Sequence, residues 1–179
     1  MRSLLTVAAL AVCAASGFSA TPAAPTKHEA MVAIDVLERN VSGKEAVEAA
    51  RTVVTYAQLS DDVMVNIGPD QVPWVTEKWG LDDDRELECQ SLLLASFVAG
   101  NVRSQIKNDR AEDDTYSGWV FAIKSYDRLR AKEHFRSDSM DALSKMEAEG
   151  TLLQHAKEIS APHSDKDEPQ GAQPAKPYA

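Results

Sequence analysis

The stretch from Asp82 to Ile106, DDDRELECQSLLLASFVAGNVRSQI, carries the clearest helical pattern in the chain. Residues at helical spacing form a largely apolar face along it, made up of Leu87, Ser91, Leu94, Ala95, Val98, Val102 and Ile106. Leu92, Leu93 and Phe97 widen this face, which is typical of a helix covered by neighbours on several sides. The carboxylates of residues 82–84 lie where they can cap free backbone N–H groups and interact favourably with the helix macrodipole. We therefore expect this segment to be the central helix of its domain.

Shorter helical patterns flank this segment on both sides. Two faces before it are expected to be buried, one made up of Met31, Ile34, Leu37 and Val41 and the next of Val47, Ala50, Val54 and Ala57. Ser42 and Glu45 match the S-x-x-E capping box, which predicts that the second of these helices begins at Ser42. Further helices are predicted within residues 116–129, 140–146 and 152–159. The sequence therefore predicts an all-α fold, a compact single domain of five to seven helices over residues 28–160.

The segment Val63–Ile67 fits two local structures. Its residues 63, 65 and 67 alternate as in a strand, whereas residues 64 and 67 continue a helical spacing that Gly68 would end. No convincing second strand is recognisable in the sequence as a partner. We expect either a helix or a short extended segment packed on the domain.

The N-terminus has the pattern of a secretory signal peptide. Arg2 precedes an apolar run from Leu4 to Ala15, which is too short to cross a bilayer of roughly 30 Å as a helix. We expect residues 1–20 to be a signal peptide, residues 21–27 to be an extended leader, and the protein to be exported to the periplasm or the cell exterior. A buried N-terminal helix is the alternative, which the proline-rich TPAAPT that follows disfavours. Residues 161–179 are rich in proline, glutamine and charge without apolar periodicity, which predicts a disordered tail.

The acidity of the chain restricts its expected partners. Its formal net charge is −9, and this becomes −10 when Arg2, the only charged residue of the signal peptide, is removed. Such a charge repels nucleic acid and anionic lipid. No second apolar run of membrane length follows in the sequence, so no stable membrane insertion is expected after signal removal. The preferred interpretation is that the acidity serves only solubility, and the alternative is that it favours cations or a protein partner with a basic surface.

Cys89 is the only cysteine outside the predicted signal peptide. No intramolecular disulfide is therefore expected, and burial is the usual state of such a cysteine. Glu86 and Glu88 lie close to it in the sequence and are expected to raise the pKa of its thiol, which disfavours a reactive role.

No catalytic, cofactor or metal motif stands out, so we predict no catalytic residues, no cofactor and no metal ligands. The acidic groups at residues 82–86 and 109–114 lack the spaced ligands and central glycine of a calcium loop. The four histidines make no zinc spacing, and Ser104–Lys107 matches S-x-x-K without its companion motifs. Two alternative functions remain: an enzyme whose acid–base site is assembled from dispersed Asp, Glu and His residues, and a cation-binding module at the acidic helix starts.

Two tryptophans and the acidic run after them form the candidate interface. Trp74 and Trp79 flank a short segment led by Pro73, and either is a candidate for a partly exposed anchor, although aromatic residues at helical spacing usually belong to the core. Asp82, Asp83 and Asp84 complete this candidate surface. The expected function is protein binding of the inhibitor, immunity or scaffold type, which acts through surface contacts rather than catalysis.

Overall fold

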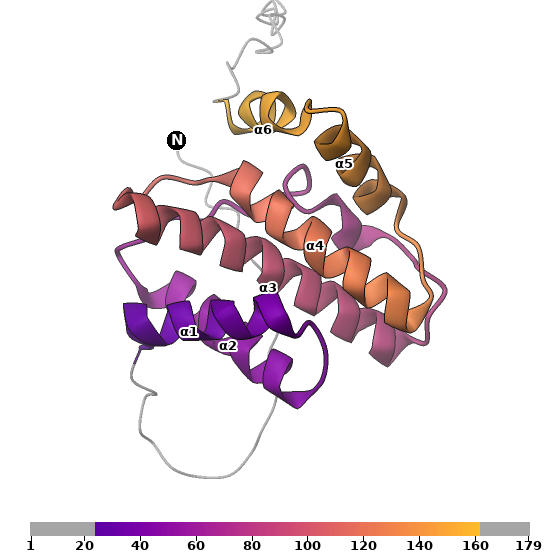
Figure 1. The fold of residues 1–179 in the computed structure, drawn as a ribbon, viewed down its shortest axis with the longest axis horizontal. Helices are drawn as coiled ribbons and strands as arrows, with labels where there is room; N and C mark the ends of the chain where they lie inside the picture. The colour runs from indigo at the N-terminus through magenta and orange to yellow at the C-terminus, as the bar shows by residue number, and fades with distance from the viewer. Residues whose placement is uncertain (1–23, 162–179) are drawn as a thin grey trace, which may run out of the picture.

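The computed structural model describes residues 24–161, which form six α-helices and one short 3₁₀ turn (Figure 1). Their bounds are α1 Lys27–Arg39, α2 Lys44–Leu59, η1 Pro73–Thr76, α3 Asp83–Asn108, α4 Thr115–Glu133, α5 Asp138–Ala148 and α6 Leu152–Ser160. No strand occurs among these described residues. The predicted all-α fold is confirmed.

Helix α3 is the centre of this arrangement. It packs against α1 and α2 on one side and against α4 on the other, while α5 and α6 cover the far side of α4 (Figure 1). Most of α3 between Leu92 and Val102 is buried, which confirms it as the central helix. The first part of the predicted face is wrong, because Leu87 and Ser91 are exposed and Cys89 is buried in their place.

The start of α2 differs from the prediction. Gly43 is the N-cap residue, with φ +85°, a conformation that favours glycine, and no side chain caps this end. The hydroxyl of Ser42 instead accepts a hydrogen bond from Lys132 Nζ at 2.8 Å. The buried face of α2 is shifted by one position from the predicted one and consists of Ala46, Ala49, Val53 and Tyr56. The physical reason is that both faces have helical spacing, and only the packing partner decides which one is covered.

A capping box is present instead at the start of α1. The backbone N–H of Thr26 donates to Glu29 Oε2 at 2.7 Å, and the Glu29 N–H donates to Thr26 Oγ1 at 3.2 Å. These reciprocal bonds satisfy two N–H groups that a helix start leaves unpaired. The first helix therefore begins at Lys27, one residue inside the predicted leader.

The segment at 63–67 lies outside regular secondary structure and is held by side chains. The side-chain amide of Gln105 binds both backbone groups of Met64, accepting from its N–H at 2.9 Å and donating to its carbonyl at 2.7 Å. The N–H of Asn66 donates to Asp113 Oδ1 at 2.8 Å. A glutamine side chain thus takes the place of the partner strand that the sequence lacks, and the packed non-helical alternative is the one observed.

Several predictions concern residues outside the range 24–161. The predicted signal peptide, residues 21–23 of the predicted leader, and the predicted tail after Ala161 lie outside the described residues. Within residues 24–161, no helix combines the length and the apolar character that crossing a membrane requires.

Candidate functional site

The two candidate anchor tryptophans are buried. Trp74 is 0% exposed and packs edge-on against Phe97, with ring centroids 6.2 Å apart. Trp79 is 7% exposed and stacks on Phe135 at 4.7 Å. The expectation that either indole is partly exposed is therefore wrong for this structure, because the loop around η1 folds both rings into the core.

The three aspartates of the candidate interface remain on the surface. Asp82 is the N-cap residue of α3, and its side chain accepts a hydrogen bond from the Arg85 N–H at 3.0 Å. Asp83 lies in the first turn with its side chain almost fully exposed, 3.8 Å from Lys78 Nζ. Asp84 is also exposed in this turn. Of the three aspartates, Asp82 has the predicted capping role, whereas Asp83 and Asp84 contribute negative charge in the first turn. The tryptophans beside them are buried and do not extend these acids into a larger contact surface.

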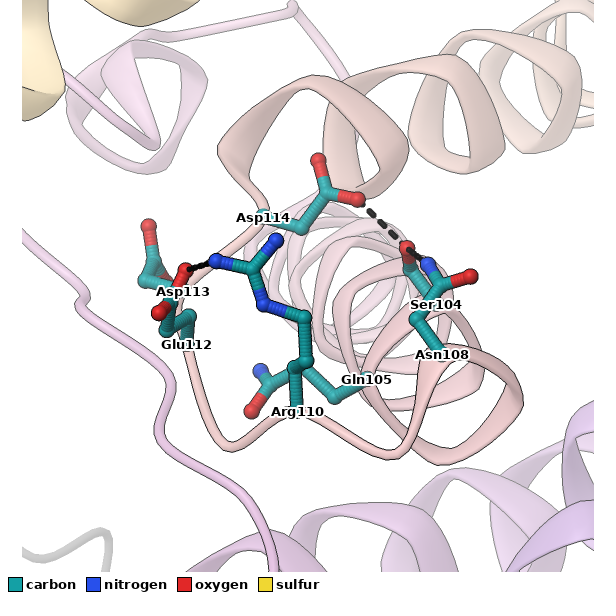
Figure 2. Close-up of a pocket in the computed structure, with 7 residues that line it drawn as sticks. All are labelled: Ser104, Gln105, Asn108, Arg110, Glu112, Asp113 and Asp114. Carbon is teal, nitrogen blue, oxygen red and sulfur yellow. Dashed lines mark hydrogen bonds and ion pairs between the residues drawn. The ribbon is translucent and has the colours of Figure 1, made fainter.

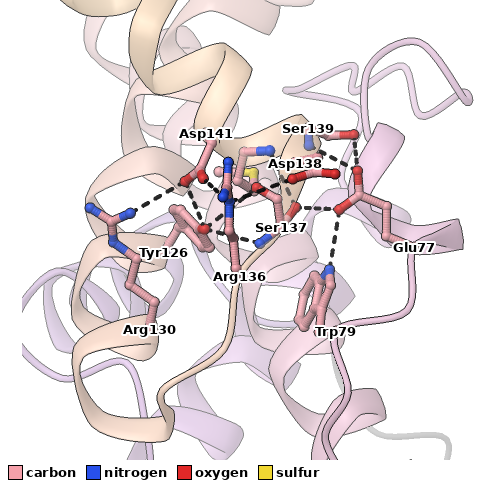
Figure 3. Close-up of polar contacts among 10 residues, drawn as sticks. Glu77, Trp79, Tyr126, Arg130, Arg136, Ser137, Asp138, Ser139 and Asp141 are labelled. Atoms are coloured by element: carbon pink, nitrogen blue, oxygen red, sulfur yellow. Dashed lines mark hydrogen bonds and ion pairs between the residues drawn. The ribbon is translucent and has the colours of Figure 1, made fainter.

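Glu77 connects the loop after η1 to the start of α5 (Figure 3). Its carboxylate accepts hydrogen bonds from the Ser137 hydroxyl at 2.5 Å, from the Ser139 N–H at 2.8 Å and from Trp79 Nε1 at 3.3 Å. The Ser139 hydroxyl is a further donor. Burial opposes ionisation of this carboxyl, but the hydrogen bonds outweigh burial, and the pKa of Glu77 lies below its ordinary value of 4.5. This network ties two distant segments together and is structural in character.

The variant Glu77→Gln is expected to be less stable than the natural protein at pH 7 by about 1–2 kcal/mol, because a neutral amide accepts these bonds more weakly. A lowered folded-state pKa stabilises the fold fully above the unfolded-state pKa, and this contribution is lost as the pH falls through the folded-state value. The stability difference should therefore shrink below about pH 4.5. Urea denaturation of both proteins at pH 7 and at pH 3 measures it. An undiminished difference at pH 3 would mean that the charge of Glu77 is irrelevant.

Cys89 is buried on α3, as the sequence predicts. Burial raises the pKa of its thiol to about 11, with Glu133 and Glu88 adding to the effect and Arg85 opposing it. Only the thiolate is an effective nucleophile, so the folded protein is expected to protect Cys89 from alkylation.

Iodoacetamide at pH 8 is expected to modify Cys89 at least about a hundredfold more slowly in the folded protein than in urea. This ratio follows from the thiolate fractions that the raised pKa of the folded protein and the ordinary cysteine pKa of the unfolded chain give at pH 8. Mass spectrometry of timed samples measures both rates, and similar rates would contradict the burial.

A polar hollow of about 520 Å³ lies where α3 ends and α4 begins (Figure 2). It is lined by Ser104, Gln105, Asn108, Arg110, Glu112, Asp113 and Asp114. Beneath it, the fully buried Asn101 donates to Asp113 Oδ1 at 2.8 Å and accepts from the Asp114 N–H at 3.1 Å. The amide pair Asn101 and Gln105 was not predicted as a polar cluster, although its i, i+4 spacing within an otherwise apolar helix would have indicated that the two side chains lie together.

Two carboxyl groups of this hollow, those of Asp114 and Glu112, have a lowered pKa. Burial opposes ionisation of Asp114, but hydrogen bonds from Ser104 and Ser117 lower its pKa below the ordinary value. A hydrogen bond from Arg110 lowers the pKa of Glu112. A general acid at neutral pH needs the opposite shift. The geometry therefore suits capping of α4 by Asp114 rather than acid–base chemistry.

The same hollow is poorly suited to a cation. Arg110 extends across it between the carboxylates, and Figure 2 shows its guanidinium paired with Glu112. A bound cation would have to displace this positive charge. In the described part of the chain, no three His, Cys, Asp or Glu side chains gather in a way that could hold a metal ion.

A second hollow, about 820 Å³ in volume, lies between α1 and α2. We call it the α1–α2 groove, and it is lined by Ala24, Pro25, Thr26, His28, Glu29, Val32, Ala33, Val36, Glu45, Glu48, Ala49 and Thr52. The two helices are joined by the short loop 40–43 and lie side by side (Figure 1). Each contributes residues at helical spacing, so the groove follows from the way two amphipathic helices pack.

The groove combines an apolar floor with an acidic rim. Val32 is 49% exposed, and Val36 and Ala33 lie beside it on α1. Glu45 and Glu48 line the α2 side and are exposed. Within the described residues Glu45 makes no ion pair, and Glu48 lies 3.7 Å from Arg51 with both side chains largely in solvent. This arrangement can hold an apolar side chain flanked by positive charge.

Comparison of the chain with protein-family models, with curated proteins and with solved structures finds no match.

Proposed function

We propose that this chain is an exported protein that acts by binding another protein through the α1–α2 groove, as an inhibitor, immunity or scaffold protein does. The observation that carries the proposal is the exposed apolar floor around Val32 beside exposed carboxylates of α2. Exposed apolar surface rimmed by polar groups is characteristic of sites where another molecule binds. The N-terminal signal pattern supports export, because its charge and apolar run have the order that secretion requires.

Comparison with the polar hollow between α3 and α4 supports the α1–α2 groove as the binding site. In the polar hollow, the carboxylates bond to groups of the protein itself. Asp114 accepts hydrogen bonds from Ser117, and Glu112 pairs with Arg110. The groove differs because the carboxylate of Glu45 has no such partner in the described part of the chain. An exposed apolar surface beside the free carboxylate of Glu45 favours protein binding over catalysis.

Photo-crosslinking tests the proposal directly. A benzoylphenylalanine placed at Val32 is expected to link the protein to one partner in an envelope fraction of its own source. The same group at Leu153, which is 46% exposed on α6, is the matched control because it is equally accessible and lies outside the groove. Mass spectrometry identifies the linked proteins. Equal products at both positions, or none at Val32, would contradict a binding role for the groove.

A further inference from the structure

We propose that the segment seated in the α1–α2 groove is a basic amphipathic helix of the partner protein. Its apolar face would lie against Val32 and Val36, and its lysines or arginines would lie opposite Glu45 and Glu48. This inference rests on the proposed function and adds the chemistry of the partner. The juxtaposition of the valine floor with the α2 carboxylates is what carries it.

The backbone of the groove favours a helix as the occupant. Both walls are α-helices, whose N–H and C=O groups bond within each helix along its length. An extended peptide gains affinity by pairing its main chain with an exposed sheet edge, and the described residues offer no strand for it to pair with. A helix needs no such pairing, because its own backbone groups are satisfied and its side chains alone make the contact.

The charge of the groove favours a basic occupant. Glu29 is engaged in the capping box with Thr26, so its carboxylate is already hydrogen-bonded. The exposed carboxylate of Glu45 has no ion-pair partner within the described residues, and that of Glu48, one turn further along α2, makes only a solvent-exposed contact with Arg51 at 3.7 Å. Residues three apart on a helix lie on one side of it, so the two charges face the groove together. Lysine or arginine at the same spacing on a partner helix would complement them.

Fluorescence anisotropy with synthetic peptides tests this inference on the full chain. The probe is an 18-residue helix with leucines on one face and lysines on the other, and its control carries glutamates in place of the lysines. The lysine peptide is expected to bind, and the glutamate peptide to bind at least about tenfold more weakly. Equal binding of the two peptides would overturn the proposal.

Variants locate the binding on the groove. The double variant Glu45→Gln with Glu48→Gln is expected to weaken binding of the lysine peptide about tenfold, the effect of two partly exposed ion pairs. Val32→Ser is expected to weaken it about fivefold by removing apolar contact. The matched control is Glu149→Gln with Glu158→Gln, which removes the same charge from exposed positions near and on α6 and should leave affinity unchanged within about twofold. If both double variants weakened binding equally, the peptide would respond only to the net charge of the protein, and the assignment of its binding site to the groove would be overturned.

The remaining outcomes separate this inference from the proposed function. If a partner crosslinks at Val32 but the lysine peptide does not compete with it, the groove binds a protein of another chemistry and only the inference fails. If the peptide binds and no partner crosslinks, the proposed function fails.

Discussion

Replacing Trp74 by alanine should lower the free energy of unfolding by about 4 kcal/mol, the cost of emptying a large aromatic site in a core. Trp74 is among the largest fully buried side chains and packs edge-on against Phe97 of α3. Its removal leaves a cavity where η1 meets the central helix, and the surrounding helices can collapse into it only in part. Urea denaturation followed by circular dichroism measures the loss.

Trp74→Phe is the control that separates volume from hydrogen bonding. The indole Nε1 of Trp74 has no hydrogen-bond partner within the described residues. Phenylalanine removes this buried unsatisfied donor while keeping an aromatic ring, so it should cost less than half as much as alanine. A stability change near zero for Trp74→Ala would place the indole at the surface, as an interface anchor requires, and would contradict the burial described here.

Replacing Gly100 by alanine should destabilise the protein by about 3 kcal/mol, although alanine is the better helix former by about 1 kcal/mol. A Cβ at this position would lie 2.3 Å from the carbonyl oxygen of Ser117 and 2.7 Å from Phe121 Cβ. Both contacts are far inside van der Waals distance, and the first is with backbone, which cannot rotate away. Helices α3 and α4 would have to separate along their shared interface.

A second substitution on α3 serves as the reference for Gly100→Ala. Leu87 is 51% exposed on the same helix, and Leu87→Ala should change stability by less than about 0.5 kcal/mol. Thermal and urea denaturation of both variants gives the comparison. A stabilised Gly100→Ala protein would mean that helix propensity decides at this position and that α3 and α4 are not in close contact there.

The interface between α3 and α4 shows what a local sequence pattern leaves undetermined. Gly118 of α4 lies opposite Phe97, whose ring would be 2.7 Å from a Cβ on this glycine. Gly100 attracts attention in the sequence as a mid-helix glycine that costs helix stability, and close contact with another helix is the reason for it. The identity of that other helix is not encoded in the local pattern.

The sequence by itself determined where most of the helices of this protein lie, but not the start of α2 or the conformation of residues 63–67. Periodic apolar residues specified the helices, and the carboxylates of residues 82–84 specified where α3 begins, because these effects act between residues three or four positions apart. Only the tertiary structure decided which faces are buried. Ala46, Ala49 and Val53 of α2 are covered although the neighbouring positions have the same spacing, because the covering helix comes from elsewhere in the chain. The burial of Trp74, the pairing of Gln105 with Met64 and the groove between α1 and α2 have the same origin, since each joins residues that local periodicity cannot relate.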